Sequence, residues 1–197
     1  MKRRASLLLI GGGLIFAAVP TLTACSSDLP AQALVAWQGP GNEPDARKWM
    51  LSYAILAPNS HNLQSWRVDL RQDGLITLYC DTTRLLPETD PFSRQIMMAQ
   101  GTFLELLDMA AREKGFRAEI NLFPEGEFGP KAVDHRPVAQ VRLTADPLVT
   151  KDPLFAQILK RHTNREAYDA KTVQADALTA IQACVVSPGM QLGVQSL

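Results

Sequence analysis

The chain has 197 residues, of which 46% are hydrophobic and 20% charged, and its 20 basic residues balance its 20 acidic ones. This composition is typical of one globular domain with an appendage and not of a disordered chain. The net charge of zero gives no electrostatic argument for a nucleic acid or an anionic membrane surface as the main partner, which leaves small molecules and other proteins.

The first residues have the pattern of an export signal. Lys2, Arg3 and Arg4 precede a short apolar run over residues 7–19, and Leu-Thr-Ala-Cys follows at positions 22–25. The run is too short for a typical membrane-spanning helix, which needs about 20 residues. A cleaved signal peptide is therefore favoured over an uncleaved anchor.

Two further properties of this signal rest on resemblance. Leu-Thr-Ala-Cys resembles a bacterial lipobox, which implies that Cys25 is lipidated and becomes the mature first residue. Arg3 and Arg4 resemble a twin-arginine signal, which implies export of a folded protein with its cofactor. We expect a signal peptide over residues 1–25 and an exported protein, either periplasmic or a membrane-anchored lipoprotein. Its only contact with the membrane would be through the signal or the lipid.

A small-residue segment and a helix come next. Residues 26–44 are rich in Pro, Gly and Ser and predict a linker. Apolar residues at helical spacing predict a helix over residues 46–57, with Asp45 as N-cap and Pro58 as its end. A polar loop over residues 59–64 follows.

Alternating apolar residues predict a strand over residues 66–70 and a returning strand over 75–80, joined at the hairpin signal Asp73-Gly74. Asp90 and Pro91 predict the N-cap and first residue of the longest helix, and Lys114-Gly115 its end. The remaining predicted elements are strands over 118–122 and 139–143 with a loop over 124–137 between them, a helix from Asp152-Pro153, a helix over 177–185, a turn at 187–189 and a strand over 190–194.

The order of elements, α-β-β-α-β-β-α-α-β, lacks regular βαβ alternation. It predicts an α+β fold with a mainly antiparallel sheet and flanking helices. The last helix, turn and partial strand would lack partners that bury their apolar faces. We therefore expect residues 45–150 to form one half of the fold and residues 151–197 to begin a second, incomplete half.

The loop reads Ala-Pro-Asn-Ser-His-Asn-Leu-Gln-Ser-Trp over residues 57–66. Asn and Gln side chains both donate and accept hydrogen bonds, which suits the mixed edge of a heterocycle such as an isoalloxazine ring. The alternative is a hydrogen-bonded turn without a ligand.

This loop resembles the A-P-S-x-H-N-x-Q-P-W signature of nitroreductase-like proteins, in particular the Acg family of FMN-binding oxidoreductases, in which it lies against the flavin. Asn59 stands where serine is usual and Ser65 where proline is usual. The resemblance implies a nitroreductase-like fold and FMN-binding residues in this loop. These are Asn59, Ser60, His61, Asn62 and Gln64.

A second motif, Arg-His-Thr-Asn-Arg at 161–165, is expected at the end of a helix. Paired guanidiniums suit a phosphate group, although cations at a helix C-terminus have an ordinary structural role as well. The motif resembles the R-R-S-x-R-x-F segment that binds the phosphate and ribityl of FMN in nitroreductases. That resemblance implies FMN contacts from Arg161, Thr163, Asn164 and Arg165.

The loop precedes the arginine motif, which is the order of Acg-type chains, whose two halves imitate a homodimer. Residues 81–94 also resemble that family. The resemblance implies one FMN site shared between the loop and the arginine motif, in a pseudo-dimer of halves or a homodimer. It implies an FMN-dependent oxidoreductase that passes electrons from a small-molecule donor to a nitroaromatic or quinone-like acceptor.

Two other functions remain open: an exported protein that binds or sequesters flavin without turnover, and an inactive truncated product. Export argues against NAD(P)H as donor, because that pool is cytoplasmic. No side chain is identified as a catalytic acid or base.

The sequence favours no other chemistry. Its three histidines are far apart, so we expect no metal site, and no dinucleotide, P-loop or nucleophile-elbow motif occurs in the mature part. We expect buried free thiols at Cys80 and Cys184, and a solvated His135. Four apolar side chains are expected in the core: Trp49, Trp66, Met97 and Met98.

Overall fold

The computed structural model describes residues 30–129, 133–169 and 171–184. It divides into two compact units, residues 1–160 and 161–197, and each is described by itself. The predicted signal, Cys25, the turn at 187–189 and the strand at 190–194 lie outside the described residues. Among the helices of the described part, none is both long and apolar enough to cross a membrane.

The first unit is built on a four-stranded antiparallel sheet with strand order β1-β2-β4-β3. Its strands are β1 (Trp66–Asp69), β2 (Leu75–Cys80), β3 (Phe116–Leu122) and β4 (Pro137–Ala145). The predicted α+β fold and its four strands are confirmed.

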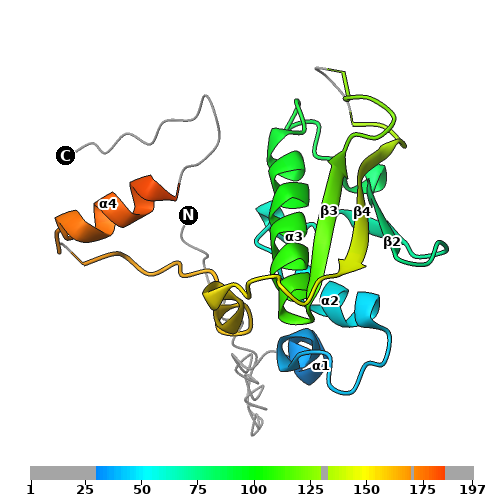
Figure 1. Cartoon of the computed structure of the whole chain (residues 1–197). Coiled ribbons are helices and arrows are strands. Elements are labelled where there is room, and N and C mark those ends of the chain that lie inside the picture. Colours follow the sequence, from blue (N-terminus) through cyan, green and yellow to red (C-terminus); the bar gives the residue numbers. More distant parts are fainter. Residues whose placement is uncertain (1–29, 130–132, 170, 185–197) are drawn as a thin grey trace, which may run out of the picture. The chain divides into compact units, whose positions relative to one another are not determined.

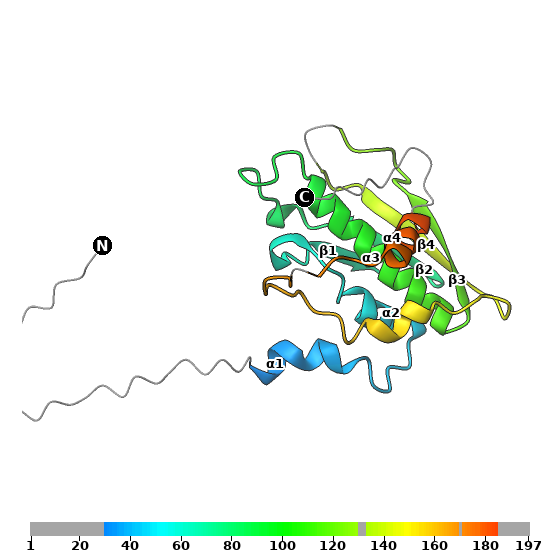
Figure 2. The same ribbon diagram turned by 90° about the vertical axis from the view of Figure 1, so that its left-hand side faces the viewer.

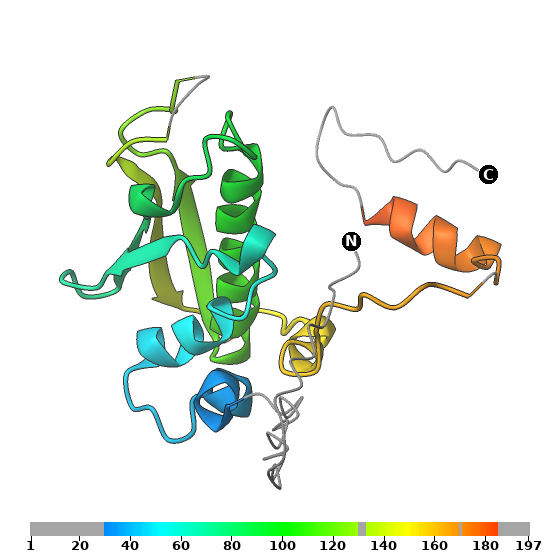
Figure 3. The same cartoon turned by 180° about the vertical axis from the view of Figure 1, so that it is seen from behind.

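The predicted hairpin joins β1 to β2. Trp66 pairs with Cys80 and Asp69 with Thr77. Gly74 lies in the left-handed region, at φ 67°, where glycine is favoured. The turn of the hairpin points away from helix α3 (Figures 1 and 3).

Helix α3 (Arg94–Glu113) lies along one face of the sheet (Figures 1 and 2). Its buried residues recur every three or four positions, as the periodicity predicts. Phe103 is fully buried, and its ring lies 5.2 Å from that of Trp66 on β1. This buried face of α3 packs on the sheet and forms the core. Burial of each large apolar side chain in it contributes about 1.5–3 kcal/mol to the free energy of unfolding. The stripe consists of Ile96, Ala99, Gln100, Phe103, Leu104, Leu107, Ala110 and Ala111.

The predicted start of this helix at Asp90-Pro91 is wrong. Ser93, at φ 53° and ψ 26°, separates Pro91 from the helix, which begins at Arg94. Asp90 still acts near the N-terminus, because its Oδ2 accepts the Ile96 amide at 3.1 Å. The predicted glycine end is confirmed, with Gly115 at φ 75°.

Helix α2 (Ala46–Ala54) has the predicted N-cap, since Asp45 Oδ1 accepts the Arg47 amide at 2.9 Å. The helix ends three residues earlier than predicted, because residues 55–57 form a turn. The Arg47 guanidinium donates to the carbonyl oxygens of Leu70 and Gln72 at 3.0 and 2.8 Å, which links α2 to the hairpin.

Residues 31–38 were expected in the linker, but they form helix α1 (Ala31–Leu34) and the 3-10 helix η1 (Val35–Gln38). Trp37 of η1 is partly buried against the core. The prediction followed the Pro, Gly and Ser residues on either side and missed the apolar run over residues 33–37.

The segment after β4 is anchored by aromatic packing. The predicted helix at 153 is a short 3-10 helix, η4 (Pro153–Gln157), whose N-cap Asp152 is as predicted. Phe155 lies 4.8 Å from the ring of Tyr53 and 6.0 Å from that of Trp49, and Ile158 is buried. These contacts fix the end of the first unit against α2.

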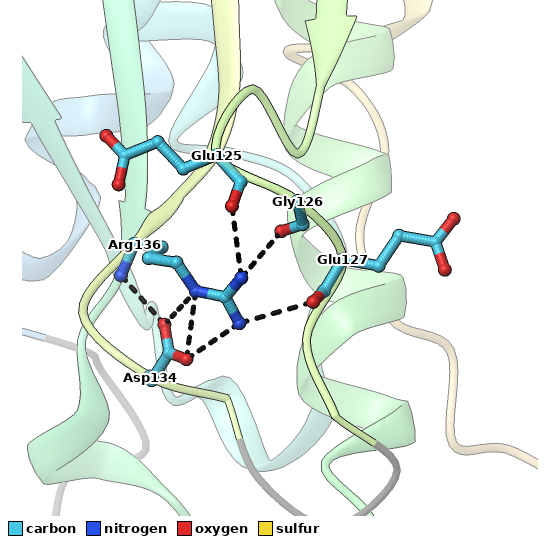
Figure 4. A network of polar contacts seen from close by, with 5 residues as sticks. All are labelled: Glu125, Gly126, Glu127, Asp134 and Arg136. Atoms are coloured by element: carbon cyan, nitrogen blue, oxygen red, sulfur yellow. Dashed lines mark hydrogen bonds and ion pairs between the residues drawn. The ribbon is translucent and has the colours of Figure 1, made fainter.

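The 124–136 loop joins β3 to β4 and closes around one guanidinium (Figure 4). Arg136 Nη1 donates to the carbonyl oxygens of Glu125 and Gly126 at 3.1 Å, and Nη2 donates to that of Glu127 at 3.2 Å. Hydrogen bonds from Arg136 also lower the pKa of the Asp134 carboxyl. Residues at both ends of the loop are therefore held by a single side chain.

The described part of the second unit contains an extended segment and helix α4 (Ala175–Ala183), which confirms the predicted helix up to residue 183. Residues 161–165 are not helical. The arginine motif therefore does not lie at a helix end as predicted, and the interpretation of its cations as a helix C-terminal decoration is wrong.

Candidate functional site

The 59–64 loop connects α2 to β1, as predicted, and includes the 3-10 helix η2 (Ser60–Asn62). Three of its residues lie in the left-handed region without being glycine: His61 at φ 54°, Asn62 at 52° and Gln64 at 48°. This conformation costs a non-glycine residue roughly 1–2 kcal/mol. Strain of this kind persists only where the surroundings impose it, and it is typical of functional sites.

Asn59 closes the loop from inside. Its Oδ1 accepts the Gln64 amide at 2.9 Å, and its Nδ2 donates to the Ala57 carbonyl oxygen at 3.1 Å. Both ends of the side-chain amide thus bind backbone. The amide at this position, where serine is usual, acts within the loop.

The other polar side chains of the loop face solvent. His61, Asn62 and Gln64 are exposed, and Ser60 is half-buried. Among residues 30–129 and 133–160, no hydrogen bond or ion pair is made by the side chains of His61, Asn62 or Gln64. One imidazole and two amides are therefore available to a ligand on one short segment.

Side chains from outside the loop hold its backbone. Arg84, at the end of η3 (Thr82–Arg84), donates from Nη1 to the Leu63 carbonyl oxygen at 2.6 Å. Thr102 Oγ1 of α3 donates to the Pro58 carbonyl oxygen at 2.8 Å. Arg84 lies in the 81–94 segment that resembles the family, but no role was predicted for it. Thr102 and Gln100 were not singled out from the sequence, although an amide inside the apolar stripe of α3 is a signal for Gln100.

Cys80 of β2, which pairs with Trp66 just after this loop, is a buried free thiol, as predicted. Burial raises its pKa to about 11, although a hydrogen bond with Ser65 partly opposes this. The thiol therefore stays protonated at neutral pH and does not act as a nucleophile. The prediction of burial is wrong for Cys184, which is exposed as a free thiol at the end of α4.

The arginine motif belongs to the second unit. Thr163, Asn164 and Arg165 are exposed, and Arg161 is half-buried. Asn164 Oδ1 accepts the Glu166 amide at 2.9 Å, which forms a local turn. The motif thus presents Thr163 and Arg165 on extended backbone.

A hollow of about 670 Å³ lies elsewhere on the first unit, and its polar lining includes Arg67, Asp69, Tyr79 and His135. None of the predicted FMN-binding residues lines it. The 59–64 loop is therefore exposed and does not form a wall of this hollow. His135 is exposed, as predicted, whereas Met98 is 70% exposed and not in the core.

Sequence comparisons support the resemblance to nitroreductase-like proteins. The chain is 30% identical over 154 residues to "Putative NAD(P)H nitroreductase Rv3131" of Mycobacterium tuberculosis strain H37Rv, covering 76% of the chain and 42% of the relative. A protein of strain CDC 1551 of the same species gives the same values.

A shorter match supports the same resemblance. The chain is 31% identical over 80 residues to "Putative NAD(P)H nitroreductase acg" of the H37Rv strain, covering 41% of the chain and 24% of the relative. The chain spans less than half the length of these curated relatives. No family model matches the chain.

Proposed function

We propose that this chain is part of a nitroreductase-type oxidoreductase and that its 59–64 loop forms one side of an FMN site. The observation that carries the proposal is the strained loop, in which the side chains of His61, Asn62 and Gln64 have no partner among the described residues of the first unit. Bound FMN would supply the hydride and electron transfer, and the protein would bind and orient it.

The donor set fits the edge of the flavin ring. Amides at Asn62 and Gln64 offer both donors and acceptors, and Ser60 and His61 add a hydroxyl and an imidazole. Asn59 would contribute by closing the loop, since both ends of its side chain are used there.

Arg161, Thr163 and Arg165 would bind the phosphate and ribityl, since arginine forks match phosphate oxygens. The local turn made by the side chain of Asn164 would shape this segment. The two sets of residues would meet either within one chain, as a pseudo-dimer of halves, or across a homodimer.

The names of the relatives suggest NAD(P)H as the class of electron donor. We propose a small nitroaromatic or quinone-like molecule as acceptor. Lipidation at Cys25 and export would separate the protein from cytoplasmic NAD(P)H, and a flavin-binding protein without turnover is then the second candidate. Steady oxidation of NADH or NADPH by the FMN-loaded protein distinguishes the enzyme from that candidate.

The test of the FMN site is a titration of the chain with FMN and with riboflavin, which lacks the phosphate, followed by flavin fluorescence. Arg161→Ala combined with Arg165→Ala should weaken FMN binding at least about tenfold, because each charge-assisted hydrogen bond contributes about 1.5–3 kcal/mol. Riboflavin binding should not change. Asn62→Ala combined with Gln64→Ala should weaken the binding of both flavins.

Arg71→Ala is the matched control, because Arg71 is exposed and pairs only locally with Asp69. FMN binding that is equal in all these variants would contradict the proposed site. Intact-mass analysis after expression in a bacterial host tests the lipoprotein proposal separately. The expected mature chain begins at a lipidated Cys25, and an unprocessed Met1 would contradict it.

A further inference from the structure

A buried amide lies directly behind the 59–64 loop. The Gln100 side chain of α3 is 1% exposed, within the apolar stripe that packs on the sheet. Its Nε2 donates to the backbone oxygen of Ser65 at 3.2 Å and to Ser65 Oγ at 3.1 Å. Ser65 directly follows the loop and is also 1% exposed.

The acceptor end of this amide lacks a hydrogen bond. Gln100 Oε1 is buried without a partner among the described residues. A buried polar atom without a partner destabilises the folded state, so an apolar side chain of similar shape would serve the core at least as well. The stability of the core therefore does not account for glutamine at this position.

The hydrogen bonds that Gln100 donates explain why glutamine occupies this position. The Ser65 carbonyl oxygen accepts from Gln100 and also from the Asp81 amide at 2.7 Å, so the end of the loop is fixed from two sides. Two residues further along α3, Thr102 holds the start of the loop through the Pro58 carbonyl oxygen. One turn of α3 thus fixes both ends of the strained segment.

We infer that Gln100 is a positioning residue: it holds Ser65 so that the left-handed residues His61, Asn62 and Gln64 keep the backbone that presents their side chains to the flavin. That the ligand is a flavin rests on the proposed function. The positioning of the loop rests on the contacts alone.

The test replaces Gln100 by methionine, which has a similar shape but no amide, and uses Gln95→Met as the control. Gln95 lies on the same helix and is exposed. Backbone amide hydrogen exchange over residues 59–65 should become about tenfold faster in Gln100→Met, since two hydrogen bonds are lost there, and should not change in the control. The FMN dissociation constant should rise by a similar factor.

Exchange over β3 and β4 serves as the internal reference, because a general loss of stability would accelerate it too. Unchanged exchange over residues 59–65 in Gln100→Met overturns the inference. Faster exchange in Gln100→Met together with an unchanged FMN dissociation constant supports the positioning of the loop and contradicts the place of the loop in the proposed FMN site. If Gln100→Met does not fold, Ser65→Ala carries the test: removing one of the two acceptors should accelerate exchange in the loop about threefold, and no acceleration overturns the inference.

Discussion

The 59–64 loop and the 124–136 loop differ in where the side chains that hold their backbone come from. The 124–136 loop is held from within, because its own Arg136 donates hydrogen bonds to three of its carbonyl oxygens. The 59–64 loop takes part of its support from outside, through Arg84, Gln100 and Thr102. Its exposed side chains at 61, 62 and 64 have no partner among the described residues of the first unit.

The two loops also differ in which residues adopt the left-handed conformation and in what these residues contact. In and next to the 124–136 loop these are Gly126, at φ 92°, and Phe123, whose ring packs 5.5 Å from that of Phe128. In the 59–64 loop they are three polar residues that gain no packing from the conformation. The strain of the 59–64 loop therefore has no structural gain beside it, unlike that of the 124–136 loop.

The largest expected effect comes from removing the core beneath the 59–64 loop. Phe103→Ala should lower the free energy of unfolding by about 3–5 kcal/mol, because a fully buried ring leaves a cavity. Chemical denaturation measures the loss. Phe92→Ala is the control, since Phe92 is 54% exposed and its loss should cost less than about 1 kcal/mol. Equal losses in the two variants would contradict the packing described.

Breaking the self-contained loop should have a smaller and more local effect. Arg136→Ala removes bonds to three carbonyl oxygens and to Asp134, and should lower the free energy of unfolding by less than Phe103→Ala does. Limited proteolysis should then cut within residues 124–136 before residues 59–64. Resistance equal to that of the unaltered chain would show that the loop does not depend on this guanidinium.

Substitutions to and from glycine should change the free energy of unfolding in opposite directions in the two loops. His61→Gly relieves left-handed strain and should raise the free energy of unfolding by about 0.5–1 kcal/mol, while FMN binding weakens. Gly126→Ala introduces such strain at φ 92° and should lower it by about 1 kcal/mol. Thermal denaturation of both variants measures the contrast, and shifts of the same sign would refute it.

The smallest effect concerns the buried thiol of Cys80 on β2. At pH 8, iodoacetamide should label exposed Cys184 readily and buried Cys80 slowly, as peptide mass mapping would show. Burial raises the Cys80 pKa from 9.0 to about 11, so the unfolded chain loses this proton first. Stability from this group should therefore decrease as the pH rises from 9 to 11. Rapid labelling of Cys80 at pH 8 would contradict its burial.

Strands and the loop between α2 and β1 were predictable, because alternation and turn residues are local signals. The sheet order β1-β2-β4-β3 was not predicted, since it depends on pairings distant in sequence. The helix start failed at Ser93 because Asp90-Pro91 is locally a good N-terminus, and only the tertiary context selects the left-handed residue after it.

In the candidate site too, some residues could be predicted from local sequence and others could not. The residues that face solvent, such as Asn62 and Gln64, carry a recognisable motif. The residues that hold the loop, Gln100 and Arg84, lie 35 and 21 positions from their acceptors Ser65 and Leu63. Contacts at such separations have no local sequence signal.

The attachment of both ends of the 59–64 loop to one turn of α3 has a thermodynamic consequence. The loop is in effect a small ring, closed by Thr102 at Pro58 and by Gln100 at Ser65. The conformational entropy of closing that ring is lost when the domain folds, before any ligand arrives. A flavin that docks on the preformed ring would have little backbone left to order, so more of its contact energy would remain as affinity.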